Sequence, residues 1–256
     1  MSAEGITVTQ VAAASDNGPA VFKSEQWVKA TDGTELYHAQ WDVPTTTPLI
    51  ATVAVVHGVG EHVSRYNHVF VSFARAGIRV RGFDQRGFGH TGRRGGILGH
   101  NDGIETTMKD IADVVTRVRV GVEDKPTFVF GHSMGGGLAL RFVGTQREGV
   151  AGAVISAPLI SLGKSTSVPA IQYYAMRGLA ALLGTLVLKQ GVDANELSHD
   201  PAEVKAYQED PFVHPYISLG TARDIVVNGD TILTKNFVNY SLPIVIAHGT
   251  KDTLTS

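Results

Sequence analysis

Short, uniformly apolar runs that alternate with helical patterns constrain the fold of this chain more than any other feature of its sequence. Each run is four to six residues long and rich in Val, Ile or Phe, which is typical of strands buried on both faces of a sheet. The runs are 51–56, 78–83, 127–130, 150–155 and 244–247, and helical spacing occurs at 69–76, 104–119 and 134–147. This alternation predicts an α/β fold with a mostly parallel central sheet and helices on both faces.

The N-terminal part departs from this alternation. Residues 26–30 and 35–41 are rich in strand-forming residues and flank the pair Asp32-Gly33, which is typical of a hairpin turn. Residues 1–22 are small and polar, so we expect a flexible arm there.

A second departure follows Pro158. About 80 residues separate the runs at 150 and 244, which is too many for a simple connection in a compact domain. We therefore expect a core made of 23–158 and 241–256, with a helical cap or lid at 159–240 over the carboxyl ends of the strands, where ligands bind in such sheets. Within the cap, an apolar helix is predicted at 168–188 and a short helix at 202–208.

Composition excludes several classes of function. Lys and Arg total 22 against 24 for Asp and Glu, a net charge of −2 that offers no basic excess for nucleic acid. The chain has no Cys, which excludes disulfide scaffolds, Cys-ligated zinc and thiol nucleophiles. We expect a cytoplasmic protein that at most lies on a membrane surface, because the start does not resemble a signal peptide and the clean apolar stretch at 178–188 is too short to span about 30 Å.

The motif Gly131-His132-Ser133-Met134-Gly135 lies between a predicted strand and a predicted helix of small residues. A strand-to-helix turn this sharp forces its central residue into a strained conformation, and glycines two residues away on either side remove the Cβ atoms that would collide. The Ser133 hydroxyl would then stand at a helix N-terminus, where the helix dipole and free N–H groups favour developing negative charge. A capping serine in a glycine-rich turn is the structural alternative.

A second glycine-rich loop, His57-Gly58-Val59-Gly60, directly follows the strand at 51–56. A tetrahedral oxyanion needs two N–H donors, one from Met134 after the nucleophile and one from such a loop, where Val59 fits. His57 and His62 could suggest a metal, but no third ligand or carboxylate pattern accompanies them, so we expect no metal and no cofactor.

These motifs, with Glu61-His62 before Arg65-Tyr66 and with Phe83-Asp-Gln-Arg-Gly-Phe-Gly-His, resemble the monoacylglycerol lipase family of serine α/β-hydrolases, particularly its fungal-type members. The resemblance implies that Ser133 is the nucleophile and that the N–H groups of Val59 and Met134 form the oxyanion hole. It also implies that Glu61 and Arg65 pair to brace the oxyanion loop. Asp84 and Arg86 are expected to hold loops by hydrogen bonds.

The catalytic acid should follow a late strand, in the chain order Ser, acid, His. Asp252 follows the run at 244–247, and the resemblance assigns the acid to it. No His follows Asp252; the ten histidines precede it, and His248 is the least poor substitute for the base. We therefore expect a truncated hydrolase without the last strand and helix of the fold, with an open sheet edge and little or no esterase activity.

The apolar helix could pack on the sheet or form a lid over it. The resemblance implies the lid, with a channel for one acyl chain lined by residues such as Leu179 and Leu183, and a glycerol-sized polar pocket near Ser133 with Gly58, Gly60 and His132. The implied reaction is hydrolysis of a lipid ester, monoacylglycerol to fatty acid and glycerol, through an acyl-enzyme. The cap could also meet a membrane or lipid-droplet surface. The alternatives are a non-catalytic ligand-binding protein on the same fold and, less suited to the apolar cap, a peptidase; the oligomeric state stays open.

Overall fold

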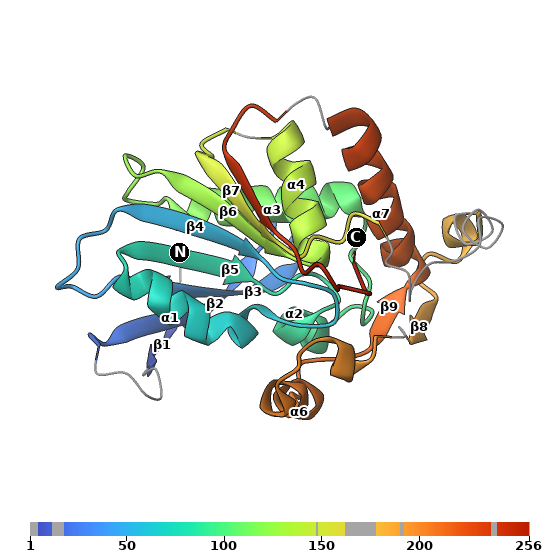
Figure 1. Ribbon diagram of the computed structural model, residues 1–256, viewed down its shortest axis with the longest axis horizontal. Helices are drawn as coiled ribbons and strands as arrows, with labels where there is room; N and C mark the ends of the chain where they lie inside the picture. Colours follow the sequence, from blue (N-terminus) through green and yellow to red (C-terminus); the bar gives the residue numbers. More distant parts are fainter. Residues whose placement is uncertain are drawn as a thin grey trace.

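The computed structural model describes residues 5–11, 18–146, 148–161, 178–189, 192–236 and 240–255. Its main sheet contains strands β1 (Thr7–Val11), β2 (Val21–Lys29), β3 (Glu35–Asp42), β4 (Ala51–Val56), β5 (Ile78–Phe83), β6 (Thr127–His132), β7 (Gly152–Ser156) and β10 (Ile244–Ala247). These eight strands lie in the order β1-β2-β3-β5-β4-β6-β7-β10 (Figure 1). Every apolar run singled out in the sequence forms one of these strands, with bounds that differ by no more than two residues.

The sheet has a parallel part and an antiparallel part. From β5 through β4, β6 and β7 to β10, every neighbouring pair is parallel. By contrast, β1, β2 and β3 add to β5 as antiparallel strands. The predicted hairpin at Asp32-Gly33 joins β2 to β3, with Lys29 opposite Glu35 in the register. The prediction of a mostly parallel sheet is therefore confirmed.

Helices cover both faces of the sheet, as predicted. Helix α1 (Asn67–Arg75) packs on one face, and helices α3 (Ile104–Val118) and α4 (Met134–Thr145) pack on the other. Strand β4 shows why its sequence lacks polar alternation: Val53 and Val55 join the cluster that contains α1, whereas Ala54 and Val56 join the cluster that contains α3 and α4. Burial of each such valine stabilises the fold by roughly 1.5–3 kcal/mol.

The prediction of a flexible arm at 1–22 was wrong for residues 7–11. These residues form β1, which pairs with β2 from Thr7 opposite Glu25 to Val11 opposite Val21. Backbone hydrogen bonds to an edge strand can order a polar segment that buries little side-chain surface, and composition does not reveal them. The rest of the predicted arm lies outside the described residues, apart from Gly5, Ile6 and 18–22.

The predicted cap contains a helical turn at 178–182 and two short strands that pair with each other. Its elements are β8 (Val187–Lys189), the 3₁₀ turn η2 (Ala194–Glu196), α6 (Pro201–Glu209), β9 (Tyr216–Ser218), α7 (Leu219–Thr231) and the π-helical turn η3 (Ile232–Asn236). The helix predicted at 202–208 is confirmed as α6. The Asp200 side chain caps it by accepting the N–H of Ala202, and Pro201 at the first position has no N–H to satisfy.

The prediction of an apolar helix at 168–188 was wrong at its C-terminal end, because Val187 and Leu188 pair with β9 as strand β8. Residues 168–177 lie outside the described part of the chain. Helix α7 packs against α4, and Ile232 already lies in the core cluster of that face. The cap elements gather at the end of the sheet where the parallel strands finish (Figure 1), and there the His214 N–H donates to the Gly60 carbonyl, 3.0 Å away.

Strand β10 is the edge strand of the sheet next to β7. Val245 is 61% exposed and Ile246 is 54% exposed, which agrees with the expected open, apolar sheet edge. Within the described ranges, none of the helices combines the length and the hydropathy that crossing a bilayer requires.

Candidate active site

Ser133 occupies a sharp turn between the last residue of β6 and the first residue of α4, at φ 53° and ψ −122°. A positive φ is rare for a residue other than glycine and costs of order 1–3 kcal/mol unless the surroundings enforce it. Here they do: the Ser133 N–H donates to the Ser156 carbonyl at 3.0 Å, and the Ser133 carbonyl accepts the N–H of Leu159 at 2.9 Å. The strain predicted from the motif is present, and Ser133 is partly exposed.

The two glycines of the motif are required by close approach of the backbone. A Cβ at Gly135 would lie 2.2 Å from the Val56 carbonyl oxygen, at the end of β4. A Cβ at Gly131 would lie 2.4 Å from the carbonyl oxygen of Gly135. The start of α4 can therefore lie directly against β4 and β6, which fixes Ser133 above the sheet.

The loop after β4 lies against Ser133. A Cβ built on Gly58 would be 3.2 Å from the Cβ of Ser133, so the predicted oxyanion loop and the predicted nucleophile are brought together. Val59 is half-buried, and Met134 is buried at the first position of α4, where a helical N–H has no intrahelical acceptor.

The Glu61 side chain holds this loop. Its Oε1 accepts the Gly58 N–H at 2.6 Å and the Tyr66 hydroxyl at 2.5 Å. Arg65 Nε lies 3.6 Å from Glu61 Oε2, so the pair implied by the resemblance is present. Burial and the nearby Glu61 carboxylate raise the pKa of Tyr66 well above its usual value, which keeps the phenol protonated as a donor. Tyr66 is the member of this network that the sequence analysis did not assign.

Asp84 and Arg86 hold loops, as expected. Asp84 Oδ1 accepts the N–H of Val63 at 2.8 Å, and Asp84 Oδ2 accepts the N–H of His90 at 2.7 Å. Arg86 binds the buried Asp110 through two of its nitrogens, at 2.7 and 3.1 Å. These charge-assisted bonds fix the segment after β5 on which the oxyanion loop rests.

The histidines near Ser133 have structural partners. His57 Nε2 accepts the Gln85 N–H at 2.9 Å, and burial lowers the pKa of this imidazole. His132 Nδ1 lies 3.2 Å from the Ser156 hydroxyl. In the described part of the chain, neither ring forms a hydrogen bond with Ser133.

Asp252 follows β10, as the acid should. Its Oδ1 accepts the N–H groups of Leu254 and Thr255, both at 2.9 Å, and its Oδ2 accepts the Thr255 hydroxyl at 3.0 Å. Burial opposes ionisation, but the hydrogen bonds from Thr255 and Leu254 prevail and lower the pKa of Asp252. Thr255 links Asp252 to His248, since its hydroxyl is 3.2 Å from His248 Nε2.

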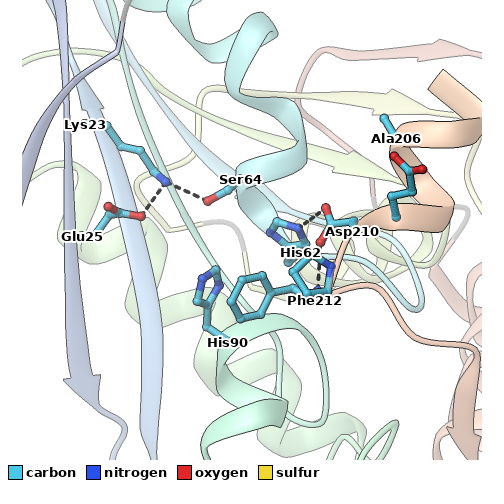
Figure 2. Close-up of a pocket in the computed structure, with 10 residues that line it drawn as sticks. Lys23, Glu25, His62, Ser64, His90, Ala206, Asp210 and Phe212 are labelled. Atoms are coloured by element: carbon cyan, nitrogen blue, oxygen red, sulfur yellow. Dashed lines mark hydrogen bonds and ion pairs between the residues drawn. The ribbon is translucent and has the colours of Figure 1, made fainter. Parts of the chain in front are cut away.

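The predicted acyl-chain residues Leu179 and Leu183 are 45% and 47% exposed. A hollow of about 440 Å³ lies elsewhere, with His62, His90 and Asp210 among its lining residues and Ser133 not among them (Figure 2). His62 and His90 of this lining, together with the buried Asp84 beside them, offer three atoms that could bind a metal ion. The expectation of no metal was based on His57 and His62 alone.

Known proteins share this architecture. Residues 47–256 match the family described as serine aminopeptidase, S33. The crystal structure of the monoacylglycerol lipase of Paleococcus ferrophilus is similar with a TM-score of 0.75 and 30% identity, over 86% of this chain and 80% of that one.

Curated proteins also match this chain by sequence. An uncharacterized abhydrolase domain-containing protein of Dictyostelium discoideum is 34% identical over 80% of this chain and 21% of its own length. A putative monoglyceride lipase of Schizosaccharomyces pombe is 32% identical over 86% of this chain and 58% of its own length. The chain thus spans about a fifth of the first relative and somewhat over half of the second.

Proposed function

The chain belongs to the monoacylglycerol lipase family of α/β-hydrolases, and on that premise we propose that it hydrolyses the ester bond of a monoacylglycerol. The observation that carries the proposal is the conformation of Ser133, held at φ 53° with the Gly58 loop against its side chain. Strain of this kind persists only where the surroundings enforce it, and it is concentrated at functional sites.

In the proposed reaction Ser133 Oγ attacks the ester carbonyl, and the bond to the glycerol oxygen breaks with release of glycerol. Water then hydrolyses the acyl-enzyme, which releases the fatty acid and restores the Ser133 hydroxyl. The N–H groups of Val59 and Met134 donate to the oxyanion of each tetrahedral intermediate. Such preorganised donors lower the barrier because they need no reorientation when the charge develops. The family pattern implies that the Ser133 proton passes to a histidine that follows Asp252 and is oriented by it; none of the ten histidines in the sequence is assigned this role.

The substrate is a lipid with one acyl chain and a polar glycerol group. Gly58, Gly60 and His132 would surround the glycerol, and the half-exposed Leu179 and Leu183 would contact the acyl chain. The 85% exposed Leu182 gives the cap an apolar surface, through which a cytoplasmic enzyme would meet the membrane or lipid droplet that carries its substrate.

The test measures release of fatty acid from a monoacylglycerol by the 256-residue chain and by the same chain fused to the C-terminal segment of the S. pombe relative, in which the family pattern predicts the catalytic histidine. We expect the fusion to release fatty acid, and we expect Ser133→Ala to abolish the release while leaving the far-UV circular dichroism spectrum unchanged.

Two outcomes would contradict ester hydrolysis and favour a different function. Binding of monoacylglycerol without cleavage by either form would favour a non-catalytic lipid-binding protein. Cleavage of an aminoacyl p-nitroanilide, with the lipid ester left intact, would favour the aminopeptidase activity after which the matched family is described.

A further inference from the structure

We propose that His62, Asp84 and His90 form a binding site for a divalent transition-metal ion of the zinc class. The three residues come from the loop after β4, the end of β5 and the helical turn α2 (Gly89–Arg94). Each offers one ligand atom, and these atoms all lie within 4.8 Å of one another. None of the three belongs to the residues assigned to ester hydrolysis, so the inference is independent of the proposed function.

His62 already has the arrangement of a metal ligand. The residue is 5% exposed, and its Nδ1 is buried without a hydrogen-bond partner in the described part of the chain. Its other ring nitrogen, Nε2, lies 2.8 Å from Asp210 Oδ2. Metal-binding histidines commonly donate their second N–H to a carboxylate, which orients the ring and increases the basicity of the ligating nitrogen. A buried nitrogen that lacks a partner is costly, and a bound ion would satisfy it.

Asp84 is fully buried, and its carboxylate is held in place by backbone donors. Oδ1 accepts the Val63 N–H and Oδ2 accepts the His90 N–H. Oδ2 also lies 2.8 Å from His90 Nδ1. An ion bound here would take the place of the hydrogen shared between these two atoms, with a small rotation of the ring to reach metal–ligand distances of about 2.0–2.2 Å.

His90 is held between two aromatic rings. The ring of Tyr37 stacks on one side, with centroids 4.0 Å apart, and the ring of Phe212 stacks on His90 at 3.7 Å. Both stacks are near parallel, at 15° and 22°. Stacking fixes the plane of the imidazole, and a metal bound to its nitrogen would lie in that plane. The close-up shows the His62 and His90 side chains in the wall of the hollow, with Phe212 beside them (Figure 2).

The hollow provides space and charge for an ion. Its volume of about 440 Å³ leaves room for water in the remaining coordination positions. Its lining carries the carboxylates of Glu25, Glu209 and Asp210 against one cation, Lys23, which binds Glu25 at 2.6 Å. Two imidazoles and one carboxylate suit zinc, cobalt or nickel, whereas magnesium and calcium prefer oxygen ligands alone.

The test is calorimetric titration of chelator-treated, full 256-residue protein with zinc chloride. We expect one site per chain, and we expect His62→Gln and His90→Gln each to weaken the affinity at least tenfold. Asp210→Asn should weaken it by about 10–100-fold, because Asp210 acts through His62. The exposed His68 of α1 supplies the matched control, and His68→Gln should bind zinc as the unmodified chain does.

Asp84→Asn alone is a poor test, since Asp84 also accepts two backbone N–H groups and its loss could unfold the chain. His90 is about a quarter exposed, so His90→Gln should preserve the fold, as thermal melting would verify. Zinc that fails to bind, or that binds both glutamine variants as tightly as the unmodified chain, would overturn the proposal. Equally tight binding of calcium would also overturn it, because that would indicate an oxygen-only site.

Discussion

The Glu61 carboxylate accepts the N–H of Gly58 at 2.6 Å, and this bond sets the position of the loop that lies against Ser133. The same oxygen accepts the buried Tyr66 hydroxyl. One carboxylate oxygen therefore ties the loop after β4 to the η1 turn (Val63–Tyr66) that precedes α1.

Glu61→Ala should destabilise the protein, because it leaves the Gly58 N–H and the Tyr66 hydroxyl without their acceptor. Each stranded buried donor costs about 1–3 kcal/mol, which urea unfolding can measure. Tyr66→Phe is the matched control: it removes one donor together with its bond and should cost only about 1 kcal/mol. Equal stability of Glu61→Ala and the unmodified chain would show that Glu61 does not brace the loop.

Val59→Pro tests the oxyanion hole, because proline has no N–H. Loss of one oxyanion donor typically lowers kcat by about 10²–10³-fold, and we expect a loss of that size in fatty-acid release by the active fusion. Val59→Ala keeps the N–H and trims only the side chain, so it should retain most of the activity. If both variants lose the same activity, the donor comes from another residue.

Ser133→Gly should be more stable than Ser133→Ala by roughly 1 kcal/mol, although both lack the nucleophile. At φ 53° a Cβ is strained, and glycine relieves this strain while alanine keeps it. Thermal unfolding of the two variants side by side measures the difference. A Ser133→Ala variant that is the more stable of the two would mean that the turn stores no strain at this position.

The parallel strands could be predicted because each is buried on both faces, so that its residues alone reveal its environment. Strand β8 could not be predicted in this way. Val187 and Leu188 end an apolar stretch that also fits a helix, and only pairing with β9 makes them a strand. The conformation at Ser133 followed from local glycine spacing. Tyr66 and the carboxylate that it shares with Gly58 needed tertiary structure to be assigned.

The group of His62, Asp84 and His90 shows the same limit. Metal motifs are recognised in a sequence by short, regular ligand spacing. Here His62 follows β4, Asp84 follows β5 and His90 lies in α2, and the parallel arrangement of β4 and β5 brings His62 beside Asp84. Exposure of Leu179 and Leu183 likewise depends on the placement of the cap rather than on their own apolar character.

Gly135→Ala should damage both stability and activity. The added methyl would lie 2.2 Å from the Val56 carbonyl oxygen and 2.4 Å from that of His57, so α4 must move away from β4 and carry Ser133 with it. Overpacking of this kind typically costs about 1–3 kcal/mol, measurable by urea unfolding. Gly178→Ala is the matched control, since no atom of the described residues lies within 4 Å of a Cβ there. Equal effects of the two changes would contradict the close approach.

Stability should fall as the pH decreases below about 6.5, the ordinary pKa of an unfolded histidine. His38 contributes because burial, followed by the charge of Arg81, lowers the pKa of its imidazole well below that value in the folded chain. Above pH 6.5 the residue is neutral in both states and has no effect. Below it the unfolded chain binds a proton that the folded chain does not, so the free energy of unfolding decreases by up to about 1.4 kcal/mol per pH unit until the folded pKa is reached. His38→Gln should flatten this slope, which urea unfolding between pH 7.5 and pH 5 measures. His68→Gln, at an exposed position, should leave the slope unchanged. Parallel stability profiles for His38→Gln and the unmodified chain would exclude His38 as the source of the pH dependence.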